Sequence, residues 1–194
     1  MQHLSRENLM SLEQYAAARP AFRAVVLAHK RDRQVAIGPH ATLYFEDRLT
    51  MQYQVQEMLR IERVFEAEGI EDELSAYNPL IPDGSNWKAT FMVEYDDIEE
   101  RHAALANLVG IENRVWVQVA GFERVHAIAD EDLERATEDK TSAVHFLRFE
   151  LTRAMAAAVN GGAAIGMGIE HEAYRHAVAA VPESTRRSLA ADLV

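Results

Sequence analysis

The sequence predicts an α+β fold in which N-terminal helices pack on a mainly antiparallel sheet with further short helices. In the first 76 residues, apolar side chains recur at spacings of three, four and seven, as in an amphipathic helix. Later runs instead alternate apolar and polar residues and are rich in β-branched and aromatic side chains. The intervening NPLIPDGSN holds turn-forming residues. We expect a single domain, 1–194, whose helical part (1–76) is joined by the 77–86 loop to a mixed part (87–194).

Two helices are expected in the first 33 residues. Ser5 is a candidate N-cap of the first helix, which should end before Pro20 because the residue preceding a proline disfavours helical geometry. The second helix ends in HKRDR (29–33), where basic side chains complement the helix dipole. An anion-binding patch is the alternative interpretation of this basic run. The following QVAIG (34–38) is either a short strand or a connector.

The longest expected helix begins at Asp47 and forms the centre of the chain. Residues that favour helix fill the run after it, and Met51 and Val55 lie on one face of that helix. Gly69 is expected to end the helix. The preceding ATLYF (41–45) has the composition of a short strand that leads into it.

Polar residues occupy part of this central helix, and two interpretations of them remain open. They form either a solvated face with Glu–Arg pairs, or a polar network or metal site against neighbouring elements. The candidate members of the polar network are Glu46, Arg60, Glu62 and Arg148. The candidate metal ligands are His40, Glu57, His145 and His171.

A pocket is expected where the central helix meets the C-terminal sheet, with His40 and Glu57 on one wall and His145 and Arg148 on the other. A Glu or Arg that faces a core is costly unless it is paired, so an inward polar line implies partners or a ligand. Glu57 and His145 would share a metal or a proton, and Arg148 would hold an anion. His171 lies just past a strand, a common position for a ligand. For each histidine, a hydrogen-bonded structural role is the alternative.

The mixed part is expected to contain strands separated by short helices. Its strongest strand signals are WKATFMVEY (87–95), RVWVQV (114–119) and SAVHFLRFEL (142–151). The remaining expected elements are a helix from 96 or 97 to about 108, a return strand over 125–129, a helical turn over 130–135, helices over 152–159 and 182–193, and a last strand over 163–169.

Composition excludes several kinds of site. The chain has no cysteine, so it has no thiol nucleophile, no disulfide, and no cysteine-bound zinc or iron–sulfur cluster of its own. Its formal net charge of −11 argues against binding to nucleic acid or to an anionic membrane surface. No apolar run approaches the roughly 20 residues that span a bilayer, and the N-terminal MQHLSRENLMSLEQY lacks a signal-peptide core. We therefore expect a cytoplasmic protein of bacterial type.

Four stretches resemble one bacterial protein family. GPHATLYFEDRLTMQYQVQEMLRIER, AYNPLIPDGSNWKATFMVEY, ADEDLER and KTSAVHFLRFEL are similar to the DUF3501 family, and the likeness covers nearly the whole chain. Members of this family are often encoded beside rubrerythrin-like proteins and cysteine-rich iron–sulfur proteins related to heterodisulfide reductase subunits. The resemblance implies a redox or oxidative-stress setting, but it implies neither an activity nor catalytic residues. Any iron–sulfur cluster would belong to a partner.

Three functions remain open from the sequence. The first is an accessory or binding protein in such a redox system, which docks on an iron–sulfur or rubrerythrin-like partner. The second is a metal-dependent or acid–base enzyme that uses the His/Glu pocket, with a transition metal as the candidate cofactor. The third is a structural homo-oligomer without a ligand. Transition metal retained by protein purified without added metal would favour the second function, or a metal-binding form of the first.

Overall fold

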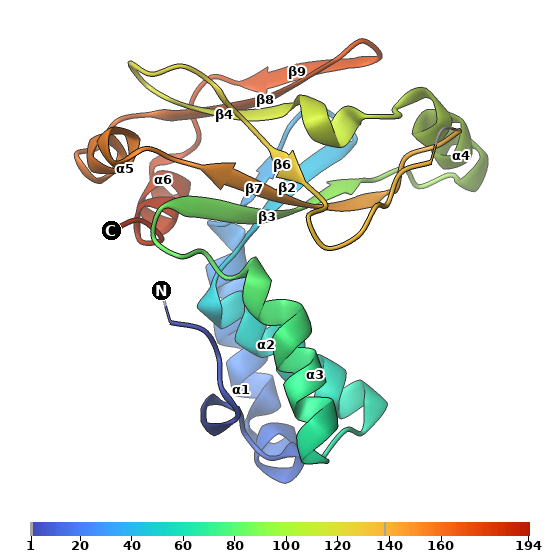
Figure 1. The fold of residues 1–194 in the computed structure, drawn as a ribbon, viewed down its shortest axis with the longest axis vertical. Coiled ribbons are helices and arrows are strands. Elements are labelled where there is room, and N and C mark those ends of the chain that lie inside the picture. The colour runs from blue at the N-terminus through green and yellow to red at the C-terminus, as the bar shows by residue number, and fades with distance from the viewer. Residues whose placement is uncertain (1, 138) are drawn as a thin grey trace.

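Two sheets with three short helices beside them, and a projecting group of three further helices, make up the molecule (Figure 1). The computed structural model describes residues 2–137 and 139–194. The helices are α1 (Leu12–Arg31), α2 (Arg48–Glu62), α3 (Ala67–Tyr77), α4 (Ile98–Asn107), α5 (Arg153–Asn160) and α6 (Glu183–Ala190). The strands are β1 (Gln34–Ala36), β2 (Ala41–Glu46), β3 (Asn86–Val93), β4 (Val115–Val119), β5 (Val125–His126), β6 (Ile128–Ala129), β7 (Val144–Glu150), β8 (Ile165–His171) and β9 (Tyr174–Val178).

Every observed strand pairing in the described residues is antiparallel, which confirms the predicted α+β class. The five-stranded sheet has the order β1-β2-β3-β7-β6, and the four-stranded sheet has the order β5-β4-β8-β9. The register places Lys88 of β3 between Glu46 of β2 and Arg148 of β7. These three charged side chains therefore share one face of the sheet.

The main core lies between the two sheets. Alternate residues of β3, including Trp87 and Phe91, are buried and pack with inward residues of the four-stranded sheet, including Val117 and Met167. Strict alternation on β3 gives one buried face and one half-exposed face, as expected when only one side of a sheet packs on another. The inner face supplies most of the hydrophobic stabilisation of the fold, and the outer face is left to interact with the helices or with solvent.

The helices α1, α2 and α3 form a unit that we call the arm, which extends away from the five-stranded sheet (Figure 1). The arm has a hydrophobic cluster of its own, separate from the main core. Its central residues come from α2 and α3 and include Val55, Leu59 and Leu74. The arm therefore buries its apolar stripe mainly within itself.

Two predicted helix boundaries in the arm are wrong. One helix, α1, continues through Pro20, where two helices were expected. Tyr15 and Val26 are buried on either side of the proline, so tertiary packing outweighs the lost backbone hydrogen bond. The helix α2 ends at Arg63, which adopts a left-handed conformation with φ of 56°, and Gly69 lies inside the next helix.

QVAIG (34–38) and ATLYF (41–45), for which short strands were considered, correspond to the strands β1 and β2, and both belong to the five-stranded sheet. The part described as helical therefore also contributes two strands. Burial alternates along much of β2, which lets it pair with β3 over its full length. β9 extends the second sheet beyond the predicted last strand, and residues 130–135 form bends where a helical turn was expected. None of the helices in the described part of the chain combines the length and apolar character of a membrane span.

The turn that precedes β2 ties the two sheets together. The Tyr174 hydroxyl of β9 donates a hydrogen bond to the Ile37 carbonyl at 2.7 Å and accepts one from the His40 N–H at 3.0 Å. Gly38 has a φ of +76°, and a Cβ added there would lie 2.6 Å from that hydroxyl and 2.5 Å from the His176 ring. Glycine is therefore required both for the backbone conformation and for the close approach of β9.

Replacing Gly38 by Ala should lower the free energy of unfolding by about 2–4 kcal/mol, because backbone strain and overpacking add. Gly121→Ala is the matched control. Gly121 has a φ of +87°, but nothing lies within 4 Å of an added Cβ, so only the strain of about 1–2 kcal/mol applies. Urea unfolding of both variants measures the difference, and equal losses would show that the contact with Tyr174 has no energetic weight.

Candidate functional site

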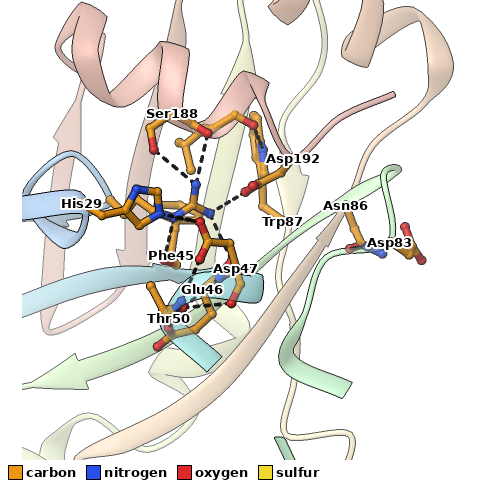
Figure 2. Close-up of polar contacts among 12 residues, drawn as sticks. His29, Phe45, Glu46, Asp47, Thr50, Asp83, Asn86, Trp87, Ser188 and Asp192 are labelled. Atoms are coloured by element: carbon orange, nitrogen blue, oxygen red, sulfur yellow. Dashed lines mark hydrogen bonds and ion pairs between the residues drawn. The ribbon is translucent and has the colours of Figure 1, made fainter. Parts of the chain in front are cut away.

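A buried arginine connects the arm, the five-stranded sheet and the C-terminal helix (Figure 2). Arg33 follows α1, and only 2 % of its side chain is exposed. Its Nε donates to the Phe45 carbonyl at 3.0 Å, and its Nη2 donates to the Glu46 carbonyl at 3.0 Å. Its Nη1 donates to the carbonyl and hydroxyl oxygens of Ser188 in α6, at 3.1 and 3.2 Å. Each guanidinium nitrogen therefore has a partner.

Two carboxylates and one imidazole complete this arrangement, which we call the joint cluster. Asp192 lies 2.5 Å from Nη2 of Arg33, and its side chain is also 2 % exposed. Asp47 caps α2 by accepting the Thr50 N–H at 2.9 Å, and its Oδ2 lies 2.5 Å from Nε2 of His29. The same Oδ2 is 3.5 Å from Nε of Arg33, so both acids act on one guanidinium.

The two acids of the joint cluster have opposite electrostatic behaviour. Burial raises the pKa of Asp192 to about 6, although the positive charge of Arg33 opposes the rise, and the nearby charge of Asp47 adds to it. Burial also opposes ionisation of Asp47, but Arg33, the Thr50 N–H and His29 outweigh it and hold the pKa of Asp47 below its ordinary value. The cluster thus contains one ionised acid and one that titrates near neutrality.

The joint cluster opens to solvent on the side of His29, whose side chain is 31 % exposed. A hollow of about 560 Å³ lies there, lined by His29, Asp47 and Asp192 together with Ser184, Arg187 and Ser188. A carboxyl with a pKa near 6 next to an accessible imidazole can take up or release a proton close to neutral pH. Acid–base chemistry is therefore what this arrangement can perform.

The four predicted metal ligands lie apart from one another. His40 stacks on Tyr95 at a ring separation of 3.9 Å, and His171 contacts the Val109 carbonyl at 3.1 Å. Glu57 lies in the arm, where it accepts from Tyr15 and Arg19, while His145 is buried against the opposite sheet. Over residues 2–137 and 139–194, no group of three or more His, Asp or Glu side chains is placed to hold a metal ion.

The expectation that Glu57 and His145 meet in one pocket is therefore wrong. The strand β7 turns His145 towards the space between the sheets, whereas α2 turns Glu57 towards α1 within the arm. Arg148 does not join His145 either, because an offset of three residues places the two side chains on opposite faces of β7.

The predicted polar network is likewise divided. Glu46 accepts from the hydroxyls of Thr50 and Thr90, whereas Arg60 pairs with Glu57 in the arm. Arg148 binds Glu131 through two hydrogen bonds and also contacts Glu150, both on the outer surface. The side chain of Glu62 makes no hydrogen bond within the described residues. Burial of Glu73 is the main cause that raises the pKa of Glu73, and the charge of Glu62 is the second cause.

His145 has a structural role in holding the segment that precedes β7. Its Nδ1 lies 2.6 Å from Asp130, and its Nε2 lies 2.9 Å from the Thr141 hydroxyl and 3.1 Å from the Ser142 carbonyl. The Thr141 hydroxyl can donate to Glu112 at 3.2 Å, which leaves its oxygen free to accept from Nε2. These contacts hold the imidazole ring of His145 in one orientation.

Sequence patterns did not identify the joint cluster because its ion pairs join residues 14 to 159 positions apart. His29 and Arg33 were assigned to a basic helix end, and that assignment is correct for neighbouring exposed residues such as Arg31. Asp192 is not marked by any sequence pattern, because a single acid near the C-terminus is usually solvated.

The whole chain is similar to one protein family and to a solved structure. A family model described as "protein of unknown function (DUF3501)" matches residues 3–193. The chain belongs to the DUF3501 family. A solved structure similar to this member of the family is the crystal structure of a novel protein of unknown function from Burkholderia pseudomallei K96243. It is 51 % identical, the match covers 100 % of both chains, and the TM-score is 0.95. No curated protein matches this chain.

This DUF3501 protein carries an apolar hollow at the far end of its arm, which we call the tip groove. The hollow measures about 510 Å³ and is lined by Leu9, Leu12, Leu59, Val64, Phe65 and Ile70 together with polar groups that include Arg6 and Glu13. Phe65 is 70 % exposed and Ile61 is 62 % exposed. Phe65 lines the tip groove, and Ile61 lies four positions before it in the chain.

The segment 60–73, which supplies Val64, Phe65 and Ile70 to the lining of the tip groove, is acidic. Residues 60–73 contain six Asp or Glu and two Arg, a net charge of −4 (2 − 6). The pKa of Glu73 is raised by burial and by the charges of Glu62 and Asp72, so the acids at this end of the arm repel one another. The surface beside the groove therefore favours a cationic neighbour.

Asp192 should make the protein less stable as the pH rises from about 4 to 6. Its pKa is near 3.8 in the unfolded chain and about 6 in the fold, so the folded state binds the proton more tightly over this range. The loss approaches about 3 kcal/mol once both states are ionised. Urea unfolding from pH 4 to 7 should therefore show the native protein losing stability relative to Asp192→Asn. Asp32→Asn, at the rim of the same hollow, is the control; parallel profiles for native protein and Asp192→Asn would contradict the assignment.

Glu57 should stabilise the arm with the opposite pH dependence. Hydrogen bonds from Arg19, Tyr15 and Arg60 lower its pKa to about 2 against the opposing effect of burial. Its contribution is therefore present above the unfolded pKa near 4.5 and is lost as the pH falls towards 2. Glu57→Gln should cost about 1–2 kcal/mol at pH 7 after allowance for solvent screening, and much less at pH 3. Denaturant unfolding of this variant, with exposed Glu71→Gln as control, tests it; a cost independent of pH would refute it.

Proposed function

We propose that this member of the DUF3501 family is an accessory binding protein that docks on a protein partner through the tip groove. The observation that carries the proposal is an arm with a hydrophobic cluster of its own that ends in an exposed apolar hollow. Burial of one large apolar side chain contributes about 1.5–3 kcal/mol, so Phe65 and Ile61 together supply useful binding energy.

The charge around the groove indicates what kind of partner fits. A net charge of −4 over residues 60–73 favours a basic surface, and the apolar floor favours aliphatic or aromatic anchors. A partner helix with one apolar face and basic flanks has both properties. The same acidic character disfavours nucleic acid as the partner, because phosphates would be repelled.

The family resemblance supplies the biological setting of the proposal. Iron–sulfur proteins and rubrerythrin-like proteins are the partners that it suggests, and the redox centre would then lie on the partner. The protein would act by holding or positioning that partner. This role needs a rigid connection between the arm and the sheets, which the hydrogen bonds of Arg33 supply.

Acid–base catalysis at the joint cluster is the second candidate function. It is favoured by one observation: a buried carboxyl with a pKa of about 6 lies beside a partly exposed histidine in a polar hollow. The unfolding measurements on Asp192→Asn bear on this function as well. If Asp192 titrates near 4, like an exposed acid, the cluster has no carboxyl with a raised pKa to support this function.

Phe65→Glu should weaken partner binding at least tenfold, because it places a charge on an apolar contact. Biolayer interferometry of the purified protein against a purified rubrerythrin-like protein, and separately against a cysteine-rich iron–sulfur protein, measures this. Ile98→Glu is the matched control, since Ile98 is 58 % exposed but lies on α4, at the sheet end of the molecule.

Three outcomes of this experiment are informative. Micromolar or tighter binding that Phe65→Glu weakens and Ile98→Glu does not supports docking at the tip groove. Equal loss in both variants, or no binding of either partner, contradicts the proposal. A mass by light scattering that is a dimer for the native protein and a monomer for Phe65→Glu would instead assign the groove to contact between two copies of this chain.

A further inference from the structure

A second groove runs between the outer face of the five-stranded sheet and the base of the arm, and we call it the outer groove. It consists of two hollows of about 620 and 500 Å³ that share Tyr77, Leu80 and Phe146 as lining residues. Both volumes lie in the range typical of small-molecule sites. The first hollow also contains Leu133 and Lys88, and the second contains Met92 and Thr90. The groove is distinct from the joint cluster and from the tip groove.

Lys88 has an unusual position among the charged residues of this groove. It lies directly between Glu46 and Arg148 on the same face of the sheet, the arrangement in which cross-strand ion pairs normally form. Glu46 is instead bound by the hydroxyls of Thr50 and Thr90, at 2.6 and 2.8 Å. Arg148 is held by Glu131 and Glu150. Both neighbours of Lys88 are therefore satisfied elsewhere.

The amino group of Lys88 is left without an acidic partner. Over residues 2–137 and 139–194, it forms no hydrogen bond with another side chain and no ion pair within 4.0 Å. The side chain is half-buried. Burial, followed by the charge of Arg148, lowers its pKa, and the more distant charges of Glu131, Asp83 and Glu150 only partly oppose this. An amine in this situation gains from any anion that enters the groove, because the anion restores the solvation lost on folding.

Part of the wall near Lys88 is apolar, and the same hollow is also lined by Glu131, Asp132 and Arg148. Leu80 and Phe146 lie at the point where the two hollows meet, and Leu133, which is largely exposed, extends the wall outward. Phe146 is held in place by the guanidinium of Arg135, which lies 4.6 Å from the centre of its ring. A ligand that fits must therefore combine one anionic group with an extended hydrocarbon part.

We propose that the outer groove binds a small amphipathic carboxylate, such as a medium-chain fatty acid. The carboxylate pairs with Lys88, and the hydrocarbon chain lies along Leu80, Leu133 and Phe146. Arg148 does not replace Lys88 in this role, because its hydrogen bonds to Glu131 and Glu150 already neutralise it. The proposal is independent of docking at the tip groove.

Isothermal titration calorimetry at pH 7 with hexanoate, octanoate and decanoate tests the proposal. Each methylene buried in the groove should tighten binding about fourfold. Lys88→Gln should weaken decanoate binding at least tenfold while leaving the unfolding temperature close to that of the native protein, since Lys88 has no ion pair to lose. Lys140→Gln, a change of the same kind at an exposed lysine, should leave the affinity unchanged.

Two further measurements separate this site from nonspecific apolar binding. Decyltrimethylammonium, which has a similar chain but a positive head, should bind at least tenfold more weakly than decanoate. Phe65→Glu, which alters the tip groove, should leave decanoate binding unchanged, so the outcome here does not depend on partner docking. Equal affinities of native protein and Lys88→Gln, equal affinities for the two head groups, or no decanoate binding at millimolar concentration would each overturn the proposal.

Discussion

The buried guanidinium of Arg33 is the constraint on which the arrangement of the molecule depends. Moving an ionised group out of water costs several kcal/mol unless hydrogen bonds replace its hydration. Arg33 meets this requirement with acceptors from β2, from α6 and from Asp192, which are elements far apart in the sequence. The Trp87 indole adds a hydrogen bond to the Leu189 carbonyl, so α6 is fixed to the sheet as well (Figure 2). Because these bonds form only in one geometry, they set how the arm leaves the sheets.

Local patterns predicted the strands of the fold better than its helix ends. Alternation identified β3, β4 and β7 because each has one face in the main core. Pro20 and Gly69 gave wrong helix ends, because both residues are tolerated inside helices when packing on the rest of the arm is strong enough. The membership of residues 34–46 in the sheet was also missed, because pairing with β3 is a long-range contact that no local pattern contains.

The sequence could indicate single polar residues of the site, but it could not indicate which residues they contact. It marked Glu57 and His145 as polar groups that need partners, and each has them: Arg19 and Tyr15 for one, Asp130 and Thr141 for the other. Which partner satisfies a buried charge depends on the topology. For this reason the joint cluster, whose members approach only when α6 returns to the start of the sheet, had no signal in the sequence.

Charged side chains that have partners help to interpret Lys88, which has no ion pair within the described residues. Arg33, Arg135 and Arg148 all have acidic partners, which shows that this fold readily supplies carboxylates to its cations. Lys88 lies beside Glu46 on the same sheet face, and yet Glu46 is directed to two threonine hydroxyls. Because Lys88 and Glu46 do not pair, the amine of Lys88 is partly desolvated in the outer groove. This lowers the stability of the fold, and an intramolecular ion pair would remove that cost. The proposed ligand carboxylate would offset that cost, because it would give the Lys88 amine the acidic partner that the protein itself does not provide.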